Sequence, residues 1–568
     1  MSVAFRIDGR DVSVEDDTVS LLDALREVLG VRSPKDGCSP QGQCGCCTVW
    51  VDGAPRVSCV TPLRRVGGRE VTTADGLPAE LARRWAEAFV ASGASQCGFC
   101  TPGIVLRLAA LETRATGSGR PVDEALIRTV LAAHLCRCTG WQSIVEAAGA
   151  VLGVDIGPSG AGGGPRLGVP SRPAWTAIDP PARDPLLATW RAQLEGPAYQ
   201  HTTRETVLGR AGFADDTAPP GATVAVPCAD GSFAFGARLV DARRASKKVQ
   251  GRNSPAPLRH LLAVPEGDWT LVLRTTWVEP AYLEPDASWC LPGRMPASPL
   301  ANGGAFGGKR RSPVAACARR LADERREPVR VVWAREDVAR RAPKRPPVAL
   351  GMREDGSGVL RVARTPEATG IDDYVALVAS VAPGLVVEPV DVAGPPVSVD
   401  LRGAGWAEPL VASAVLALVA RGGARGSGRS PSAAARALEP GTPVEVHAPS
   451  GGRARVSIDR DGTVHVEVWA GEVLDEVVLR SYCLGAVHQA LGWVRSEGIA
   501  VDGAGEVQDL TIRSYGVLSA RDTPWVDVTL HQEDRWPVNG SDAVFAATAA
   551  AAWIADGLAP DWPTRRRS

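Results

Sequence analysis

Cysteines supply the clearest chemistry in this sequence. Of the 13 in the chain, nine lie between Cys38 and Cys138. Four thiolates hold one iron–sulfur cluster, so two sets of four suit two [2Fe–2S] centres. The first set is Cys38, Cys44, Cys47 and Cys59, and the second is Cys97, Cys100, Cys136 and Cys138.

The loop around the first set is rich in glycine, which lets backbone N–H groups approach an anionic cluster closely. Cys46 is a fifth thiol in that loop, and we expect it to be a bystander. Zinc is the alternative for the second set, but Cys136 and Cys138 are separated by one residue, whereas zinc ligand pairs usually have two to four between them. Inert buried thiols are a further alternative, although free cysteines rarely cluster in this way.

A second candidate site is the glycine-rich run from Gly303 to Lys309, which has the spacing of a phosphate-binding loop. Arg310 stands where that motif needs a hydroxyl, which disfavours an NTPase. Two interpretations remain: a tight turn before the helix expected near Pro313, or a backbone cradle for a cofactor at that helix N-terminus. Phe306 in this run is either a pocket wall or a core residue.

The elements that position these residues begin with two predicted hairpins. Residues 3–8 and 11–14 alternate in polarity around Gly9, and Asp52-Gly53 is a tight-turn signal in a second β-rich pair. Ser20 is the expected N-cap of an amphipathic helix over 21–30. Residues 1–76 therefore predict a small β-grasp, ferredoxin-like domain. Residues 77–155 show four stretches with helical spacing and predict a four-helix [2Fe–2S]-binding domain.

The rest of the chain predicts mixed α/β domains, so the fold class is multidomain α+β. A linker rich in Gly, Pro and Ser is expected over 156–180. A second flexible segment, over 421–437, is expected to divide the region 181–568 into about 181–420 and 438–568. Strand-like runs such as TLVLRTTWV and PVRVVWA lie in the first of these parts.

Composition limits the function classes. The 568 residues include 63 basic and 64 acidic ones, a net charge of −1 that gives no electrostatic case for nucleic acid or an anionic membrane. The longest apolar runs are shorter than the roughly 18 residues that a membrane-spanning helix needs. The acidic N-terminus does not resemble a signal peptide, so we expect a cytoplasmic protein.

The first 155 residues resemble the iron–sulfur subunit of the xanthine dehydrogenase/aldehyde oxidase family of molybdenum hydroxylases. The matching stretches are CSPQGQCGCCTV, VDGAPRVSC, SQCGFCTPGIV and LCRCTGW. The resemblance implies an outer cluster in the β-grasp domain and an inner cluster in the helical domain, with Gln96 and Cys138 beside a molybdopterin. Five residues separate Cys38 from Cys44, one more than the family usually has, so the loop is expected to bulge.

Landmarks of the family's molybdopterin-binding subunit follow in family order, in a region that is shortened overall. They are TVLGRAGFADD, AYLEPDASW, NGGAFGGK, the Arg402-Gly-x-Gly segment and a closing portion near the C-terminus. The resemblance implies that Gly304, Phe306, Gly307 and Arg402 contact the cofactor. The family's central Gly-Gln-Gly-type loop is not recognisable.

A carboxylate base beside the metal is also implied, in a Gly-x-Gly-Glu motif. This chain has Asn539-Gly540-Ser541-Asp542 there, so Asp542 keeps the carboxylate on a side chain one methylene shorter. The alternative is that these four residues form an Asx-type turn or N-cap for the Ala-rich helix over 543–555. Gln489 is a weak further match to the family, and the neighbouring His488 is expected to be a packed histidine rather than a ligand.

Three functions stay open from the sequence. The leading hypothesis is an oxidoreductase component that passes electrons from a molybdenum–molybdopterin centre, in this chain or a partner, through two [2Fe–2S] clusters. Its implied partners are a molybdopterin-binding subunit, an FAD-binding subunit and a small-molecule substrate. The FAD-binding subunit is implied because no dinucleotide fingerprint is present here. The second is a complete compact hydroxylase with Asp542 as base. The third is a non-catalytic iron–sulfur sensor or scaffold.

Overall fold

The computed structural model describes residues 2–157, 183–196, 198, 200–247, 257–423 and 438–565. The linker predicted over 156–180 lies almost wholly outside these residues, as does most of the segment predicted over 421–437. The observed architecture is α+β with several sheets, as the sequence predicts.

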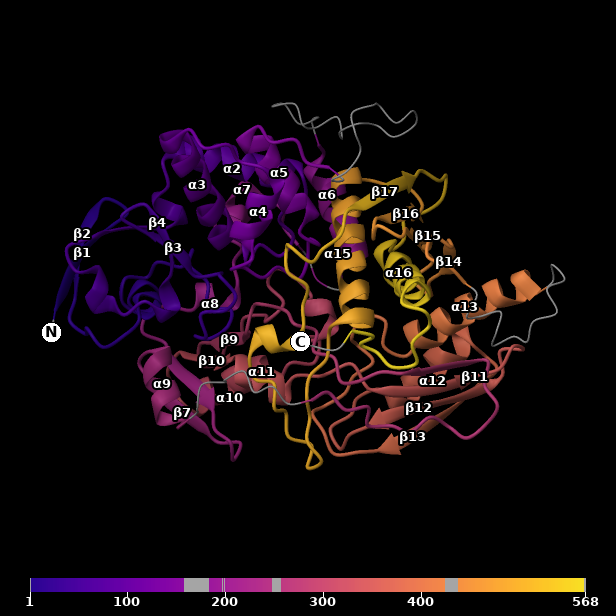
Figure 1. The fold of residues 1–568 in the computed structure, drawn as a ribbon. Coiled ribbons are helices and arrows are strands. Elements are labelled where there is room, and N and C mark those ends of the chain that lie inside the picture. Colours follow the sequence, from indigo (N-terminus) through magenta and orange to yellow (C-terminus); the bar gives the residue numbers. More distant parts are fainter. Residues whose placement is uncertain are drawn as a thin grey trace.

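The N-terminal part is a five-stranded sheet in the order β2-β1-β5-β3-β4 (Figure 1, indigo). Both predicted hairpins are present, and the first strand also pairs in parallel with the last, which is the pairing of a β-grasp fold. The strands are β1 (Val3–Ile7), β2 (Arg10–Val14), β3 (Thr48–Val51), β4 (Ala54–Val57) and β5 (Glu70–Thr72).

The crossing helix of this domain is shorter than the predicted 21–30. Ser20 is its N-cap, accepting from the Asp23 N–H in a capping box, but the α-helix α1 spans only Leu21–Asp23. A π-helical turn over Ala24–Val28 continues it. The difference has a physical reason: Arg26 in this turn is buried and donates to the Pro34 carbonyl at 2.9 Å, a tertiary contact that apolar periodicity does not reveal.

The four predicted helices over 77–155 are all present and stack above the N-terminal sheet in Figure 1. Their apolar faces share one core with the cysteine loops, which places both thiol sets inside a single packed unit. The helices are α2 (Ala79–Ala91), α3 (Thr101–Ser118), α4 (Glu124–Leu131) and α5 (Gln142–Leu152).

Three four-stranded sheets follow, in the orders β7-β6-β10-β9, β13-β12-β11-β8 and β14-β15-β16-β17. Their strands are β6 (Thr223–Pro227), β7 (Phe233–Gly236), β8 (Leu271–Arg274), β9 (Asp286–Cys290), β10 (Val329–Trp333), β11 (Val348–Met352), β12 (Gly358–Arg364), β13 (Leu385–Asp391), β14 (Val444–His447), β15 (Arg453–Ile458), β16 (Val464–Trp469) and β17 (Val526–His531). Helices pack between and over them: α6 (Pro185–Glu195), α7 (Arg204–Val207), α8 (Ala214–Thr217), α9 (Leu239–Ala245), α10 (Val314–Arg325), α11 (Arg335–Arg341), α12 (Ile371–Val381), α13 (Ala407–Gly423), α15 (Glu476–Arg495) and α16 (Ser541–Ala555).

Helices α15 and α16 lie side by side at the centre of the larger region (Figure 1). α16 is Ala-rich and buried almost all round, as a helix without a polar face must be. Both helices share one apolar cluster with the second and third of these sheets, from Leu271 to Trp562. The segment over 421–437 therefore interrupts the sequence but does not separate two hydrophobic cores.

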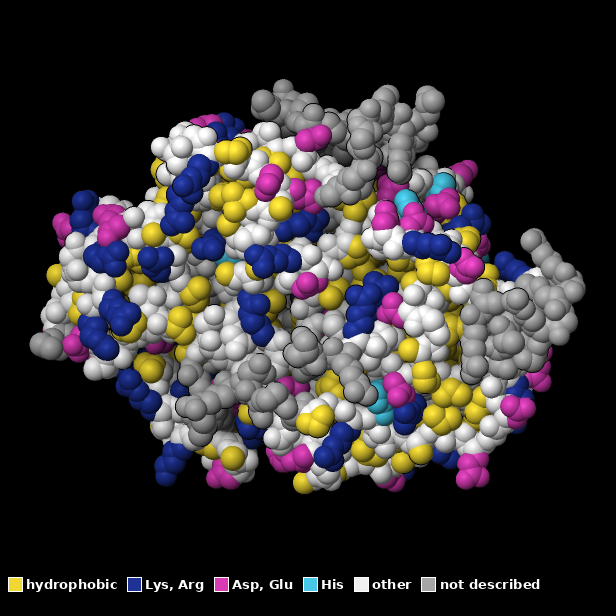
Figure 2. Space-filling model, viewed as in Figure 1, with side chains coloured by type: hydrophobic (Ala, Val, Ile, Leu, Met, Phe, Trp, Pro, Cys, Tyr) yellow, Lys and Arg dark blue, Asp and Glu magenta, His cyan; other side chains and the backbone are white. Residues whose placement is uncertain are grey.

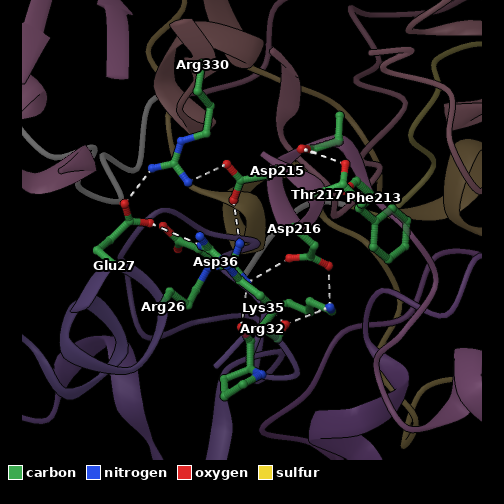
Figure 3. A network of polar contacts seen from close by, with 12 residues as sticks. Arg26, Glu27, Arg32, Lys35, Asp36, Phe213, Asp215, Asp216, Thr217 and Arg330 are labelled. Carbon is green, nitrogen blue, oxygen red and sulfur yellow. Dashed lines mark hydrogen bonds and ion pairs between the residues drawn. The ribbon is translucent and has the colours of Figure 1, made fainter. Parts of the chain in front are cut away.

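Buried charges join the β-grasp domain to the larger region (Figure 3), and we call them the ionic clasp. Asp215 accepts from Arg26 at 2.6 Å and pairs with Arg330 at 3.3 Å. Asp216 pairs with Arg26 at 2.9 Å and with Lys35 at 2.5 Å. Glu27 completes the clasp by pairing with Arg330 at 2.6 Å. Arg26–Asp215 joins residues 189 apart in sequence and Glu27–Arg330 residues 303 apart, so the clasp fixes the domain that carries the first thiol set.

We expect Asp215→Asn to lower the free energy of unfolding by about 3 kcal/mol at pH 7. Burial alone would raise the pKa of Asp215, but the charges of Arg330 and Arg26 lower it to about 2. A carboxyl with a pKa near 3.9 when unfolded then stabilises the fold above about pH 4 and loses that contribution as pH falls towards 2. Urea unfolding measured by fluorescence at pH 7 and pH 3 tests this.

Asp52→Asn is the control, because its pair with Arg69 is exposed and should leave the unfolding midpoint nearly unchanged. A deficit for Asp215→Asn that is equally large at both pH values would contradict the electrostatic explanation.

The surface in Figure 2 carries basic and acidic side chains interspersed, without one large patch of a single sign. No helix in the described part of the chain is both long and apolar enough to cross a membrane.

Candidate functional site

The first thiol set converges from two segments: Cys38, Cys44 and Cys47 lie in the loop before β3, and Cys59 lies in the Ser58–Val60 3₁₀ turn after β4. Hydrogen bonds from the Cys44 and Cys59 thiols lower the pKa of Cys38 well below its usual value. Cys59 also contacts Cys47, whose sulfur accepts from the Cys59 N–H at 3.4 Å. The Gln41 N–H donates to the Cys38 sulfur at 3.2 Å. All four sulfurs are thus linked, and main-chain N–H groups point at them.

The loop does not follow a regular path between Cys38 and Cys44. Ser39 adopts a left-handed backbone with φ of 56°, which is uncommon for a residue other than glycine. Asp36 supports it, accepting from the Ser39 N–H at 3.0 Å and from its hydroxyl at 3.2 Å. The extra residue expected to make the loop bulge lies in this stretch.

The second thiol set joins the N-terminus of α3 to the loop before α5. Cys97 and Cys138 bring their sulfurs to 3.6 Å, and Cys100 contacts Cys136. A hydrogen bond from Cys100, with help from Thr139, lowers the pKa of Cys136 to about 6. The structure therefore brings together each of the two sets proposed from the sequence.

In the described residues, no three Cys, His, Asp or Glu side chains surround one point as a single metal ion requires. In the second set, sulfur contacts join Cys97 to Cys138 and Cys100 to Cys136, whereas in the first set Cys38 contacts both Cys44 and Cys59. Four thiolates are the ligands of one [2Fe–2S] cluster, so each set has the number of thiols that a cluster needs.

The two thiol loops touch each other directly. The Leu135 N–H donates to the Cys44 carbonyl at 3.0 Å, and Leu135 immediately precedes Cys136. At the other end, α15 presses on the second set: a Cβ on Gly485 would lie 1.9 Å from the Cys138 carbonyl oxygen. Only glycine fits at that position, so α15 and the Cys138 backbone are in close contact.

A cavity of about 560 Å³ lies against the second thiol set. Its size is typical of a small-molecule or cofactor pocket. The predicted residues Cys138, Gly304, Phe306, Gly307, Arg402 and Asp542 all line it, although they come from distant parts of the chain. The predicted ligands Cys97 and Cys100 also line it. The lining further includes residues that were not predicted as site residues: Glu195, Gln200, Tyr282, Glu284, Asn302, Arg310, Asp400 and Tyr482.

The glycine-rich run forms one wall of this cavity. Ala305 and Phe306 both have a left-handed backbone, with φ of 47° and 54°. Gly307 follows with φ of 92°, and a Cβ there would lie 1.7 Å from the Asp400 carbonyl oxygen. Strained backbone of this kind is typical of functional sites.

The run forms a tight turn, which is one of the two interpretations left open by the sequence. A single 3₁₀ turn spans Ala305–Gly307, and α10 begins at Val314, next to the expected Pro313. Lys309 is fully buried and pairs with Glu284 at 2.7 Å, so it is held away from any phosphate. The sequence therefore matches the spacing of a phosphate-binding loop, but its lysine forms a buried ion pair with Glu284 instead.

Arg402 lies next to the glycine-rich run in the cavity lining and binds three other lining or neighbouring residues. Its guanidinium donates to Asp542 at 3.1 Å and to the Ser541 hydroxyl at 2.7 Å, and its backbone N–H donates to the Phe306 carbonyl at 3.0 Å. Burial raises the pKa of Asp542, and the charge of Arg402 opposes that shift. Asp542 is therefore a cavity carboxylate in an ion pair with Arg402.

The Asx-turn interpretation is also correct for the residues before Asp542. The Asn539 side-chain oxygen accepts from the Asp542 N–H at 2.9 Å, and α16 begins at Ser541 rather than 543. Glu195 accepts from the Gly540 and Ser541 N–H groups at 3.0 and 2.8 Å, and Arg191 pairs with it at 2.9 Å. This buried pair was not predicted, and the Arg–Glu spacing of four on one helix was its only sequence signal.

The remaining predicted residues lie just behind the cavity. Gln96 donates to the Cys138 carbonyl and the Ser481 hydroxyl, both at 3.0 Å. Gln489 connects Arg402 to Arg137: its side-chain oxygen accepts from Arg402 at 3.4 Å, and its amide nitrogen donates to the Arg137 carbonyl at 3.3 Å. His488 is buried, with its pKa lowered by burial to about 4 and its ring bonded to the Leu518 carbonyl at 3.1 Å, so it is a packed histidine as expected.

Glu284 and Ser450 both line the cavity with a buried side-chain oxygen that has no hydrogen-bond partner among the described residues. In Glu284 this atom is Oε1, while Oε2 pairs with Lys309. Burial raises the pKa of Glu284 to about 7 against the opposing charge of Lys309. A buried carboxyl oxygen without a partner is costly, which indicates that a ligand supplies one.

Comparison with known proteins connects these features to a family. Residues 73–149 match the family described as the [2Fe-2S] binding domain. The chain is 39% identical over 149 residues to one of the nicotinate dehydrogenase subunits of Pseudomonas putida, covering 26% of this chain and 91% of that protein. It is 41% identical over 127 residues to the xanthine dehydrogenase iron-sulfur-binding subunit of Escherichia coli O157:H7, covering 22% of this chain and 77% of that protein.

The larger region is related in structure rather than in sequence. Aldehyde oxidoreductase of Megalodesulfovibrio gigas is 38% identical over 145 residues, which is only 16% of its length. The solved structure of aldehyde oxidoreductase from Desulfovibrio gigas aligns with a TM-score of 0.65 and 14% identity, over 100% of this chain and 99% of that one. At that identity the alignment shows the fold alone, and it extends the likeness beyond the iron–sulfur part.

Proposed function

We propose a function for this chain as a member of the xanthine dehydrogenase/aldehyde oxidoreductase family of molybdenum hydroxylases, to which it belongs. It is an oxidoreductase that passes electrons from a molybdenum–molybdopterin centre through two [2Fe–2S] clusters to a flavin or another acceptor. The eight predicted thiolates are the cluster ligands, and the cavity beside Cys138 holds the molybdopterin.

The observation that carries this proposal is the position of the second thiol set. Cys97 and Cys138 line the same cavity as Arg402 and Asp542. An electron carrier in direct contact with a cofactor-sized cavity is the arrangement that electron withdrawal from a bound redox centre requires. The sensor and scaffold hypotheses do not explain a cavity of this size beside the thiols.

The residues of the cavity fit a molybdopterin. Gly303, Gly304 and Gly307 leave the backbone of the run uncovered by side chains at three positions, and Arg402 supplies guanidinium donors. Glu284 Oε1 could accept from a donor such as a pterin N–H. When bound, the group would supply the two-electron oxidation of substrate. Asp542 would accept the proton that this oxidation releases, and Arg402 would hold the carboxylate in place.

The electrons would then leave one at a time through the protein. The electrons would enter at Cys138 and Cys97 beside the cavity. The Leu135–Cys44 hydrogen bond connects the loop of the second set to that of the first. An acceptor beyond the first set completes the route, and a separate FAD-binding protein is the partner we propose. The short relatives that match the N-terminal part are themselves named as subunits.

The cavity favours one of the alternatives that the sequence left open. Because Gly304, Phe306, Arg402 and Asp542 meet beside Cys138 within one chain, we propose that the molybdopterin is bound here rather than in a partner. This makes the chain a compact hydroxylase, with Asp542 as its base, in addition to an electron carrier.

Metal analysis of the anaerobically purified chain tests the proposal. We expect about four irons per chain, two for each [2Fe–2S] cluster, and molybdenum equimolar with the chain. Iron without molybdenum, with activity appearing only after a second polypeptide is added, would move the catalytic centre to a partner. Zinc at the thiols, or a colourless protein, would contradict the proposal entirely.

A further inference from the structure

Arg335, the first residue of α11, is a fully buried arginine next to the first thiol set. Its Nη2 donates to the Gly37 carbonyl at 3.0 Å and to the Leu283 carbonyl at 2.8 Å. Its Nη1 is buried and has no hydrogen-bond partner in the part of the chain that the structure describes. The polar groups that face it are thus main-chain carbonyls, and Tyr282 lies 5.8 Å from its guanidinium.

Other buried arginines of the described chain are bound to carboxylates. Arg345 pairs with Glu408 at 2.8 Å, Arg137 with Glu497 at 2.5 Å, and Arg191 with Glu195 at 2.9 Å. Glu279, the carboxylate whose charge acts on Arg335, is itself paired with Lys344 at 2.8 Å. A buried cation without its own anion is strongly unfavourable, because desolvation is not offset by an attractive charge.

An anion would stand beside Arg335 once a cluster is bound. Gly37, whose carbonyl Arg335 holds, directly precedes Cys38, and a Cβ on Gly37 would lie 3.2 Å from the Cys44 sulfur. A [2Fe–2S] cluster with four thiolates has a net negative charge, and that charge grows by one on reduction.

We propose that Arg335 is the buried counter-ion of the first [2Fe–2S] cluster and raises its reduction potential. The inference rests on the proposed function in one respect, that the first thiol set holds a cluster. When the first cluster takes one electron from the second, the second is oxidised by one electron and no bond forms or breaks. Arg335 favours this transfer because a fixed cation stabilises the more negative, reduced cluster.

Arg335 comes from the larger region, whereas the thiols come from the N-terminal domain. The first cluster therefore has its full electrostatic environment only when the two regions are docked. Lys35 strengthens that docking at the same loop: its backbone N–H donates to the Cys46 carbonyl at 3.2 Å, and its ammonium group is held in the ionic clasp by Asp216.

The test is a redox titration of the full-length holoprotein, followed by EPR of each reduced cluster. We expect Arg335→Gln to shift the first cluster's reduction equilibrium at least tenfold towards the oxidised form, which is about 59 mV for one electron. The second cluster should keep its potential. Arg335→Lys preserves the charge and should remain within that tenfold range of the wild type.

Arg128→Gln is the matched control, because Arg128 also donates to main-chain carbonyls, at Ala520 and Thr523, but lies in the helical domain. It should leave the first cluster's potential unchanged. If Arg335→Gln loses the cluster, wild-type protein with ¹⁵N-labelled arginine should show an arginine nitrogen coupling in the pulsed EPR of the first cluster, and Arg335→Lys should remove it.

Different results would contradict the role of Arg335 and the proposed function. An unaltered first-cluster potential in a fully loaded Arg335→Gln protein, or the absence of that nitrogen coupling, would overturn the role of Arg335 alone. A wild-type protein without any cluster signal would overturn the proposed function on which it rests.

Discussion

Cys44→Ala is expected to leave about two irons per chain instead of about four, with complete loss of electron transfer to an external acceptor. Cys44 contacts the Cys38 thiolate in the first set, so its removal takes away one of four ligands. The second cluster should persist, since Cys97, Cys100, Cys136 and Cys138 are untouched. Iron analysis and EPR of the dithionite-reduced protein measure both effects.

Cys46→Ala is the matched control, two residues along the same loop and equally buried. Its thiol donates to the Cys44 carbonyl at 3.8 Å and is not counted among the four ligands. This variant should keep about four irons and both EPR signals. If Cys46→Ala lost a cluster and Cys44→Ala kept it, the ligand assignment within the loop would be wrong.

Asp542→Asn is expected to lower kcat by about 10²–10⁴-fold in the cofactor-loaded chain, the usual contribution of a general base. Asparagine keeps the shape and the hydrogen bond from Arg402 but cannot accept a proton. Burial raises the pKa of Asp542, so the wild-type kcat should fall on the acid side at a higher pH than an ordinary aspartate would give. Turnover of aldehyde or N-heterocycle substrates with an artificial acceptor, measured across pH, tests both statements.

Asp542→Glu restores the longer carboxylate of the family motif. We expect it to retain or increase kcat, because an offset near 1 Å in a catalytic group costs on the order of a hundredfold. Asp556→Asn is the control: Asp556 ends the same helix and pairs with Arg495 at 3.1 Å, outside the cavity. Full turnover by Asp542→Asn would leave Asp542 only the role of anchoring Arg402.

The parts of the fold that the sequence predicted correctly are those encoded locally. The hairpins around Gly9 and Asp52-Gly53 and the four helices after residue 77 follow from turn residues and apolar periodicity within short windows. The two thiol sets were recognisable because several ligands in each lie within a few residues of one another. The other cavity residues were named from family resemblance, and the structure brings Gly304, Phe306, Gly307, Arg402 and Asp542 together.

Long-range pairing explains what was missed. Glu195 caps a helix that begins about 345 residues later, and Arg335 reaches a carbonyl about 298 residues earlier, so no sequence window contains both partners. The π-helical turn after α1 has the same origin, because Arg26 is drawn into the ionic clasp. The tight turn in the glycine-rich run and the helix that begins next to Pro313 agree with one of the two interpretations from the sequence, because both are encoded locally.

The ionic clasp has a consequence for assembly. Two short relatives that match the N-terminal part are named as subunits, whereas here both halves of the clasp belong to one polypeptide. Covalent continuity converts their association into an intramolecular event with a high effective concentration. Each cavity therefore keeps its own electron carriers, in fixed one-to-one proportion, even at dilutions that would separate a complex of individual chains.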